Sequence, residues 1–282
     1  MNYFKTTVLL ALLAGFFVFM GQMLGGSQGA FIALVMAGIM NLGAYWFSDK
    51  IVLAMYRAKP VTEADAPGFY SIVSDLAMKT GMPMPKVYMM ENDTPNAFAT
   101  GRNPSHAAVA VTTGIMKLLT KEELMGVVGH EMAHIKNRDI LISTVAATIA
   151  GAISYLAHMA YFSSMFGNRD NRGGGNPLIA VAMMMLAPIA AMIIQMAISR
   201  SREFVADESG AKITGNPLYL ADALRKLERY NKRIPMAGVN EATSHMFIVS
   251  PLSGGGLLKL FSTHPPIEER VRRLEAMLGY TR

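Results

Sequence analysis

The sequence predicts a mainly α-helical integral membrane protein with four transmembrane helices and a cytoplasmic α+β part that carries a small β-sheet. Two observations indicate this fold class. The first is composition, because 52% of the 282 residues are hydrophobic and only 16% are charged, whereas soluble domains average about 25% charged residues. The second is charge placement, because three long stretches contain no charged residue at all.

These uncharged stretches account for the four predicted spans. The first runs from Thr6 to Ser48. It has room for two spans of about 20 residues each, which we place at 6–24 and 30–47 with a glycine-rich turn between them. The stretches 140–168 and 173–199 each accommodate one more span. Two alternatives stay open: a cleavable signal peptide at the N-terminus, and a second hairpin that is buried in a soluble core.

Basic residues near the span ends predict the orientation. One side is flanked by Lys5, Lys50, Arg57, Lys59, Lys136, Arg138, Arg200 and Arg202, and the other by Arg169 and Arg172 alone. Because cytoplasmic loops carry the excess of Lys and Arg, both termini and both polar blocks are expected in the cytoplasm. The predicted units are an N-terminal transmembrane hairpin at 1–48, a second hairpin at 140–199, and two cytoplasmic parts at 49–139 and 200–282.

Local patterns predict the elements of the cytoplasmic blocks. Thr120 and Glu123 have the spacing of a capping box, which indicates that a helix begins there. Other helices are expected at 68–79, 217–231 and 265–278. Short β-type runs lie at 86–90, 96–100 and 107–111, and a turn at 101–105 joins the last two.

Composition also narrows the chemistry. The sequence has no cysteine, which excludes disulfides and thiolate metal sites, so a bound metal must be held by histidines and carboxylates. The net charge of +6 comes without a basic run or interleaved aromatic residues. Nucleic acid is therefore not an expected partner.

The predicted helix that begins at Thr120 contains the sequence His130-Glu131-Met132-Ala133-His134. Residues four apart lie on one face of a helix, so the two imidazoles can bind one zinc ion while Glu131 reaches a metal-bound water. This is the arrangement of zinc hydrolases.

A catalytic zinc needs a third protein ligand and an open position for water. The extended motif with a third histidine six residues further on is absent, because Ile140 stands there. The second hairpin returns to the cytoplasm just before Glu203, which we predict as the third ligand. Asp207, four residues later, would accept a hydrogen bond from the far nitrogen of a ligating histidine. The alternative is a solvated acidic face at a helix start.

Four motifs of the chain occur together in a known family. They are Asn96-Ala97-Phe98, His130-Glu131-Met132-Ala133-His134 with Asn137-Arg138-Asp139, Ser201-Arg202-Glu203-Phe204-Val205-Ala206-Asp207, and His264-Pro265-Pro266. Through these motifs the chain resembles, over essentially its whole length, the HtpX branch of the M48 membrane metalloproteases, relatives of the CAAX prenyl protease Ste24. One departure is Phe204, where the family pattern often has tyrosine.

The resemblance implies a gluzincin-type metalloprotease domain and a zinc-dependent endopeptidase of the bacterial inner membrane. The implied partners are the lipid bilayer and misfolded or damaged membrane proteins, or unfolded polypeptides, as substrates. One Zn²⁺ per chain would be held by His130, His134 and Glu203, with Glu131 as general base. Asn96 and His264 match positions that bind the substrate backbone or stabilise the oxyanion. Alternatively, these two residues only shape a turn and cap a helix.

Three further expectations concern function. The run 96–100 would form a sheet edge to which an extended substrate adds as another strand. The loop 250–258 is expected to be a surface linker, with a mobile lid as the alternative. A zinc-binding membrane scaffold or chaperone without hydrolysis is the second function class, and a transporter is disfavoured because the spans lack charged residues. The sequence leaves substrates, oligomeric state and the depth of the second hairpin in the bilayer open.

Overall fold

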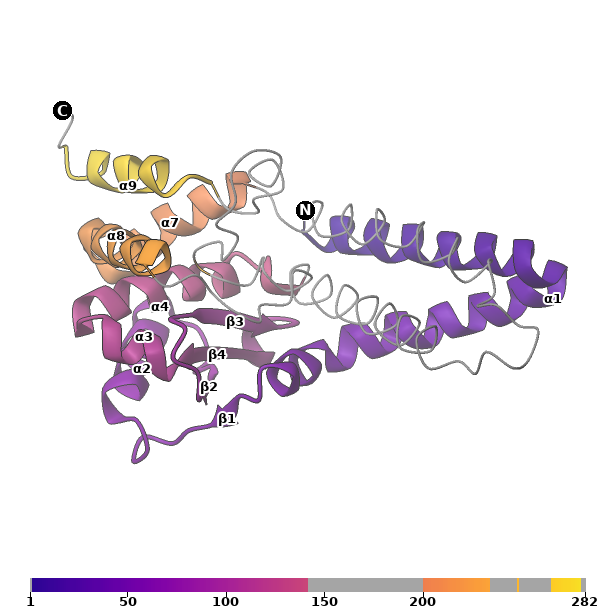
Figure 1. Cartoon of the computed structure of the whole chain (residues 1–282), viewed down its shortest axis with the longest axis horizontal. Helices are drawn as coiled ribbons and strands as arrows, with labels where there is room; N and C mark the ends of the chain where they lie inside the picture. The colour runs from indigo at the N-terminus through magenta and orange to yellow at the C-terminus, as the bar shows by residue number, and fades with distance from the viewer. Residues whose placement is uncertain (1, 142–199, 234–247, 249–264, 280–282) are drawn as a thin grey trace.

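The computed structural model describes residues 2–141, 200–233, 248 and 265–279. Figure 1 shows a helical part that projects from a mixed α/β body. The predicted second membrane hairpin, the loop 250–258 and His264 lie outside the described residues. The described elements, in order, are α1 (Asn2–Met55), β1 (Lys59–Pro60), α2 (Pro67–Thr80), β2 (Lys86–Met90), β3 (Ala97–Gly101), η1 (Pro104–His106), β4 (Ala107–Thr112), α3 (Thr113–Leu118), α4 (Lys121–Lys136), α7 (Arg200–Thr214), α8 (Pro217–Arg233) and α9 (Ile267–Ala276).

Helix α1 forms the projecting part, and Figure 1 shows two arms of it that run in opposite directions. The chain stays helical through the expected turn, and Gly26 alone has a left-handed backbone, with φ of 58°. Glycine adopts this conformation without steric cost. Among the described residues, Gly26–Phe47 is a segment long and apolar enough to cross a membrane. The helix continues past the predicted boundary at residue 48 to Met55, because Val52 and Leu53 in its last turns pack against the sheet.

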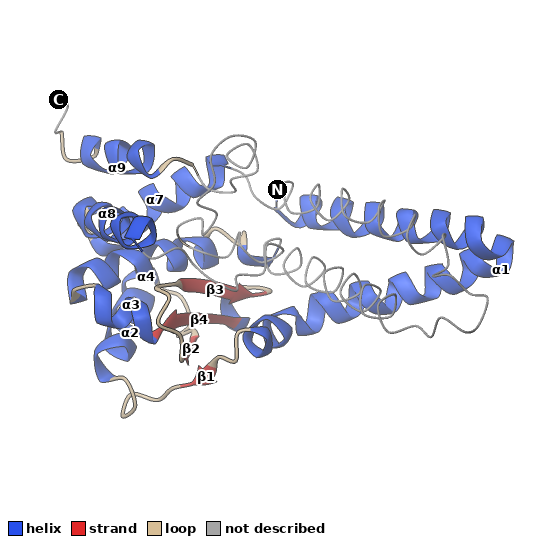
Figure 2. Ribbon diagram, viewed as in Figure 1, coloured by secondary structure: helices blue, strands red, loops and turns tan. Residues whose placement is uncertain are grey.

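The small sheet confirms the three predicted strands and adds the short β1. The order is β1-β2-β4-β3, with β2 parallel to β4 and the other pairs antiparallel. The predicted turn at 101–105 joins β3 to β4 in the register Phe98 with Ala110. Figure 2 shows β3 at the rim of the sheet, next to α4. Within the described part of the chain, β3 pairs with β4 alone and is therefore an edge strand.

The two faces of the sheet bury different partners. Side chains alternate along a strand, so Val109 and Val111 face the main core while Ala108 and Ala110 face the other way. The second face packs on the end of α1, where Val52 lies. The sheet thus connects the apolar hairpin to the α/β body.

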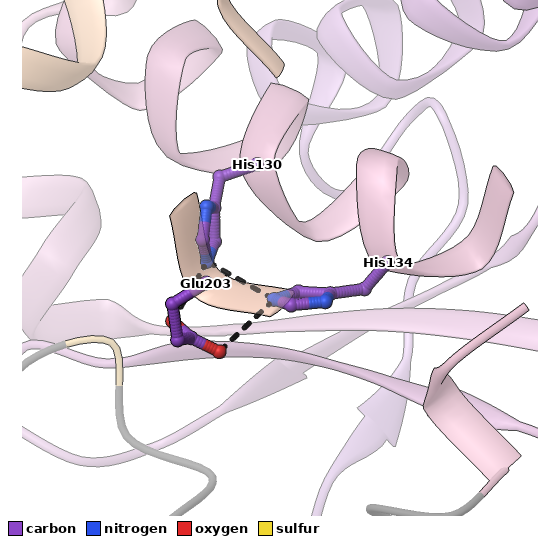
Figure 3. Close-up of side chains that lie close together, drawn as sticks. All are labelled: His130, His134 and Glu203. Atoms are coloured by element: carbon purple, nitrogen blue, oxygen red, sulfur yellow. Dashed lines mark hydrogen bonds and ion pairs between the residues drawn. The ribbon is translucent and has the colours of Figure 1, made fainter. Parts of the chain in front are cut away.

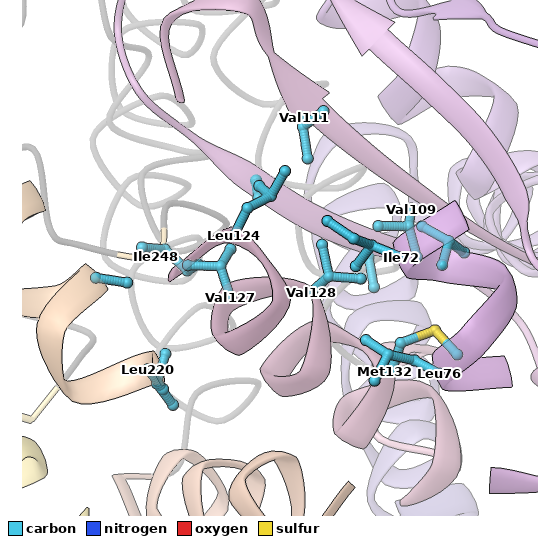
Figure 4. Close-up of a cluster of buried hydrophobic side chains, with 14 of the residues drawn as sticks. Ile72, Leu76, Val109, Val111, Leu124, Val127, Val128, Met132, Leu220 and Ile248 are labelled. Carbon is cyan, nitrogen blue, oxygen red and sulfur yellow. The ribbon is translucent and has the colours of Figure 1, made fainter. Parts of the chain in front are cut away.

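Helix α4 is the centre of the main core. Its first turn is fixed by the predicted capping box, in which Thr120 and Glu123 each accept a hydrogen bond from the backbone N–H of the other. The apolar side of the helix packs against α2, the sheet and α8, as Figure 4 shows. The side chains on this side are Leu124, Val127, Val128 and Met132. This packing fixes the rotation of α4, and with it the direction in which its polar side points.

Glycines allow α7 to approach α4 very closely. A Cβ atom built on Gly210 would lie 2.8 Å from the backbone nitrogen of His130 and 3.0 Å from the carbonyl carbon of Gly129. These are backbone atoms and cannot move aside without displacing a helix. Only a residue without a side chain permits this crossing of the two helices.

We predict that Gly210→Ala forces α7 away from α4. Although alanine favours helix by about 1 kcal/mol, overpacking of this kind costs about 1–3 kcal/mol, so thermal unfolding followed by circular dichroism in detergent should show a lower Tm. The control is Gly68→Ala in α2, where a new Cβ meets no atom within 4 Å. An unchanged Tm for Gly210→Ala would show that the helix contact is looser than described.

Candidate metal centre

Two imidazoles from α4 face each other at the core of the site. The Nε2 atoms of His130 and His134 lie 3.1 Å apart. The two rings are nearly perpendicular, at 87°. The residues are one helical turn apart and therefore share a face. The apolar packing of α4 directs this face toward α7.

Helix α7 adds a carboxylate to the pair, as Figure 3 shows. The Oε2 atom of Glu203 lies 3.6 Å from Nε2 of His130, and its Oε1 atom lies 3.6 Å from Nε2 of His134. His130 and Glu203 are buried, and His134 is partly buried. The structure therefore brings together the three residues that the sequence suggests as ligands.

This set of donor atoms fits a tetrahedral metal ion. An ion with bonds of about 2.0–2.1 Å holds its ligand atoms about 3.3 Å apart. The distances of 3.1 Å between the two nitrogens and 3.6 Å from each nitrogen to Glu203 lie on either side of that value. Two imidazoles and one carboxylate leave the fourth position of such an ion open.

Carboxylates hold the far side of both imidazole rings. Nδ1 of His134 lies 3.1 Å from both carboxylate oxygens of Asp139. Nδ1 of His130 lies 2.9 Å from Oδ1 of Asp207, although its N–H is not well aligned with that oxygen. A carboxylate at Nδ1 favours the tautomer with the proton on Nδ1, which leaves the Nε2 lone pair free for a metal. Asp207 thus lies beside the far nitrogen of His130, and its role as a hydrogen-bond acceptor for a ligating histidine stays a prediction.

Asp139 is a residue whose role the sequence analysis missed. Helix α4 ends at Lys136 with Asn137 as its C-cap, and Arg138 then adopts a left-handed conformation with φ of 57°. This turn folds the chain back, so that the N–H of Asp139 donates to the carbonyl of His134. The Asp139 carboxylate then lies beside Nδ1 of the His134 imidazole. The sequence gives no signal for this contact, because the left-handed turn at Arg138 is made by a residue other than glycine.

The acidic surroundings make His134 strongly basic in the absence of metal. Burial lowers the pKa of His134, but the Asp139 carboxylate outweighs this effect and, together with Glu203 and Glu131, raises the pKa to about 10. At neutral pH this histidine is therefore protonated when no metal is bound.

Glu131 lies on the same helix and contacts the sheet edge. Its Oε2 atom accepts a hydrogen bond of 2.7 Å from the backbone N–H of Ala99 in β3. Burial raises the pKa of Glu131, against the opposing effects of His130, His134 and this hydrogen bond. A carboxylate with a raised pKa next to a metal site is suited to accept and return a proton.

Asn96 precedes β3 and is buried. Its side-chain oxygen accepts a hydrogen bond of 3.3 Å from the N–H of Ile248, and its backbone N–H donates to the Thr112 hydroxyl at 2.9 Å. The side chain thus holds another part of the chain in this structure. A role for Asn96 toward substrate stays a prediction, as does that of His264.

The chain matches proteases of known family. The model of peptidase family M48 matches residues 63–278. A "Protease HtpX homolog" from Thermodesulfovibrio yellowstonii is 63% identical over 279 residues, which is 98% of this chain and 99% of that protein. A second protein of the same name, from Syntrophotalea carbinolica, is 58% identical over 98% of this chain and 99% of its own length.

A solved structure supports the fold. The crystal structure of Ste24p from S. mikatae superposes with a TM-score of 0.51 and 18% identity, over 97% of this chain and 65% of that one. At this identity the likeness concerns the fold alone. The family match and the relatives that align over nearly their full length support the activity as well as the fold. The chain is therefore a membrane metalloprotease that belongs to peptidase family M48.

Proposed function

We propose that the enzyme uses one Zn²⁺ per chain to cleave misfolded or damaged membrane proteins, or unfolded polypeptides, at the cytoplasmic face of the bacterial inner membrane. The observation that carries this proposal is the convergence of His130, His134 and Glu203 with Glu131 beside them. Glu131 connects this set to β3, which is an edge strand of the sheet within the described part of the chain. Metal, base and substrate strand would then lie within one small volume.

The donor set favours zinc over other common divalent ions. Magnesium and calcium prefer sites made of oxygen atoms, whereas two imidazoles and one carboxylate form a frequent catalytic zinc set. When bound here, zinc would polarise the scissile carbonyl and lower the pKa of a water molecule. His130 and His134 would offer their Nε2 atoms because Asp207 and Asp139 hold the opposite nitrogens.

Glu131 would carry the proton during hydrolysis. It accepts a proton from the attacking water and returns it to the nitrogen of the departing amine, so the carboxylate ends the cycle as it began. Its burial disfavours the charged form, which makes the proton transfer to it easier. The Ala99 N–H orients the carboxylate while it is ionised.

The edge strand β3 is suited to bind substrate as an added strand. The register to β4 directs the backbone groups of Phe98 toward β4 and those of Ala99 away from it, as the bond from Ala99 to Glu131 shows. An extended peptide could pair with the outward carbonyl of Ala99, whereas the Ala99 N–H already donates to Glu131. Its backbone would then pass beside the general base.

The apolar hairpin explains how a membrane substrate reaches this edge. Phe98 of β3 packs on the end of α1, and its ring centroid lies 5.2 Å from that of Tyr56. The site is therefore anchored directly to the helix that carries the Gly26–Phe47 segment. We propose that the protein is multi-pass, with the two predicted hairpins as four spans and both termini in the cytoplasm, which the positive-inside rule supports.

We predict that Glu131→Gln abolishes cleavage and retains zinc. Glutamine keeps the shape and can still accept the Ala99 N–H, but it cannot take a proton, so kcat should fall about 10²–10⁴-fold. The measurements are zinc content and hydrolysis of an unfolded membrane protein by the purified full-length enzyme. Cleavage at the original rate would contradict the assigned base. Zinc binding without cleavage in the unaltered enzyme would favour the non-hydrolytic scaffold.

We predict that zinc affinity rises with pH. His134 is protonated in the metal-free protein below its pKa of about 10, so metal binding must displace a proton. The apparent affinity should rise about tenfold per pH unit between roughly pH 6 and 8. Chelator competition at several pH values, with calorimetry in two buffers to count released protons, measures this effect. An affinity independent of pH would show that His134 is neutral before zinc binds.

We predict that N-methylation of a peptide substrate inhibits cleavage at alternate positions. In an added strand, successive amides point toward and away from β3. Methyl groups on the amides that face β3 should raise KM, whereas methyl groups on the neighbouring amides serve as the control. Equal effects at successive positions would contradict binding as a strand.

A further inference from the structure

Arg270 in α9 is a fully buried arginine beside the metal centre. Among the residues that the structure describes, it has the largest fully buried side chain, with 0% exposed. Its Nε and Nη2 atoms donate to the two carboxylate oxygens of Asp207 at 2.8 and 2.7 Å. Its Nη1 atom donates to the carbonyl of Ile248 at 3.2 Å. A buried charge is costly unless it is paired. These contacts are therefore what allows a charged guanidinium to be buried at this position.

The fork of Arg270 fixes the plane of the Asp207 carboxylate. Both oxygens are held, and Oδ1 is also the atom 2.9 Å from Nδ1 of His130. Rotation of this carboxylate would break one of the paired contacts with Arg270. Three helices are thus connected in sequence, from Arg270 on α9 through Asp207 on α7 to the imidazole of His130 on α4.

Arg270 also acts on the predicted third ligand. Its Nη1 atom lies 4.0 Å from Oε2 of Glu203. Four buried carboxylates surround the site: Glu131, Asp139, Glu203 and Asp207. Two positive charges from a divalent ion would balance only half of their charge, so a buried arginine reduces the remaining repulsion.

A second connection reaches the substrate strand. Ile248 accepts a hydrogen bond from Arg270 through its carbonyl and donates one through its N–H to the side chain of Asn96. Asn96 directly precedes β3. The guanidinium therefore contacts Asp207, which lies beside His130, and the carbonyl of Ile248, whose own N–H binds the side chain of Asn96 before β3.

We propose that Arg270 is a positioning residue of the metal centre. It orients His130 through Asp207, and its positive charge lies 4.0 Å from the Glu203 carboxylate. This inference rests on the proposed zinc chemistry of the site. Arginine is required here because its planar fork binds both oxygens of a carboxylate, which the single ammonium of lysine cannot do.

The experiment compares Arg270→Lys with Arg272→Lys in the full-length protein. Arg272 lies on the same helix, but its side chain is 75% exposed. Chelator competition gives the zinc affinity, and the visible spectrum of the cobalt-substituted protein reports ligand geometry. Loss of a partner that orients a metal ligand typically lowers affinity by about 10–100-fold. We expect this loss, an altered cobalt spectrum and a lower kcat with little change in KM for Arg270→Lys, and none of these changes for Arg272→Lys.

Three outcomes would overturn the proposal. Zinc affinity and a cobalt spectrum unchanged in Arg270→Lys would show that the fork is not needed. Equal losses in Arg272→Lys would show a general effect of α9. Full additivity of Arg270→Lys with Asp207→Asn would show that the two residues act independently. Lysine keeps the buried charge, so the variant retains the fold, and circular dichroism verifies this. If the unaltered enzyme bound zinc without cleaving substrates, the proposed function would fail while affinity and spectrum still tested Arg270.

Discussion

The close contact between α4 and α7 is the constraint on which the rest of the structure depends. One helix carries the two imidazoles and the other carries the carboxylates that complete the site. Neither helix holds the metal set alone. Gly210 allows the backbones to approach until a single additional carbon atom would collide with His130. Because the metal geometry tolerates errors of only a few tenths of an ångström, the separation of these helices decides whether a site exists.

The site also concentrates negative charge in the interior of the protein. Four acidic side chains are buried within one small region, and such a cluster is unstable unless cations balance it. Arg270 supplies a permanent positive charge. The negative charge that it leaves unbalanced favours a proton or a metal ion between the histidines. In the protein without metal, this excess of negative charge raises the pKa of His134. Metal affinity, proton affinity and the fold of α9 are therefore linked properties of one network.

Much of this arrangement can be predicted from the sequence because it depends on local patterns. The start of α4 is determined by Thr120 and Glu123, and the β3–β4 turn is determined by residues next to it. The four-residue spacing of His130 and His134 places them together on any helix. The spacing of Glu203 and Asp207 does the same on α7, so the candidate ligands can be named without a structure.

What could not be predicted depends on contacts between distant segments or on unusual backbone conformations. Asp139 reaches His134 only because Arg138 adopts a left-handed turn, for which a non-glycine residue gives no sign. Arg270 stands among other charged residues and looks solvated. However, it occupies an apolar position in the pattern of Ile267, Val271 and Leu274, and that irregularity is its signal. The parallel pairing of β2 with β4 likewise follows from the tertiary fold.

The account is tested most directly by X-ray absorption spectroscopy of the zinc-loaded protein in lipid. It predicts one zinc per chain in a four-coordinate site, with two imidazole nitrogens and only oxygen otherwise, at about 2.0–2.1 Å. Replacing Glu203 with glutamine should change the oxygen contribution and leave both imidazoles in place. A spectrum with fewer than two imidazoles, or one unchanged by the Glu203 replacement, would contradict the convergence of α4 and α7 on a single metal ion.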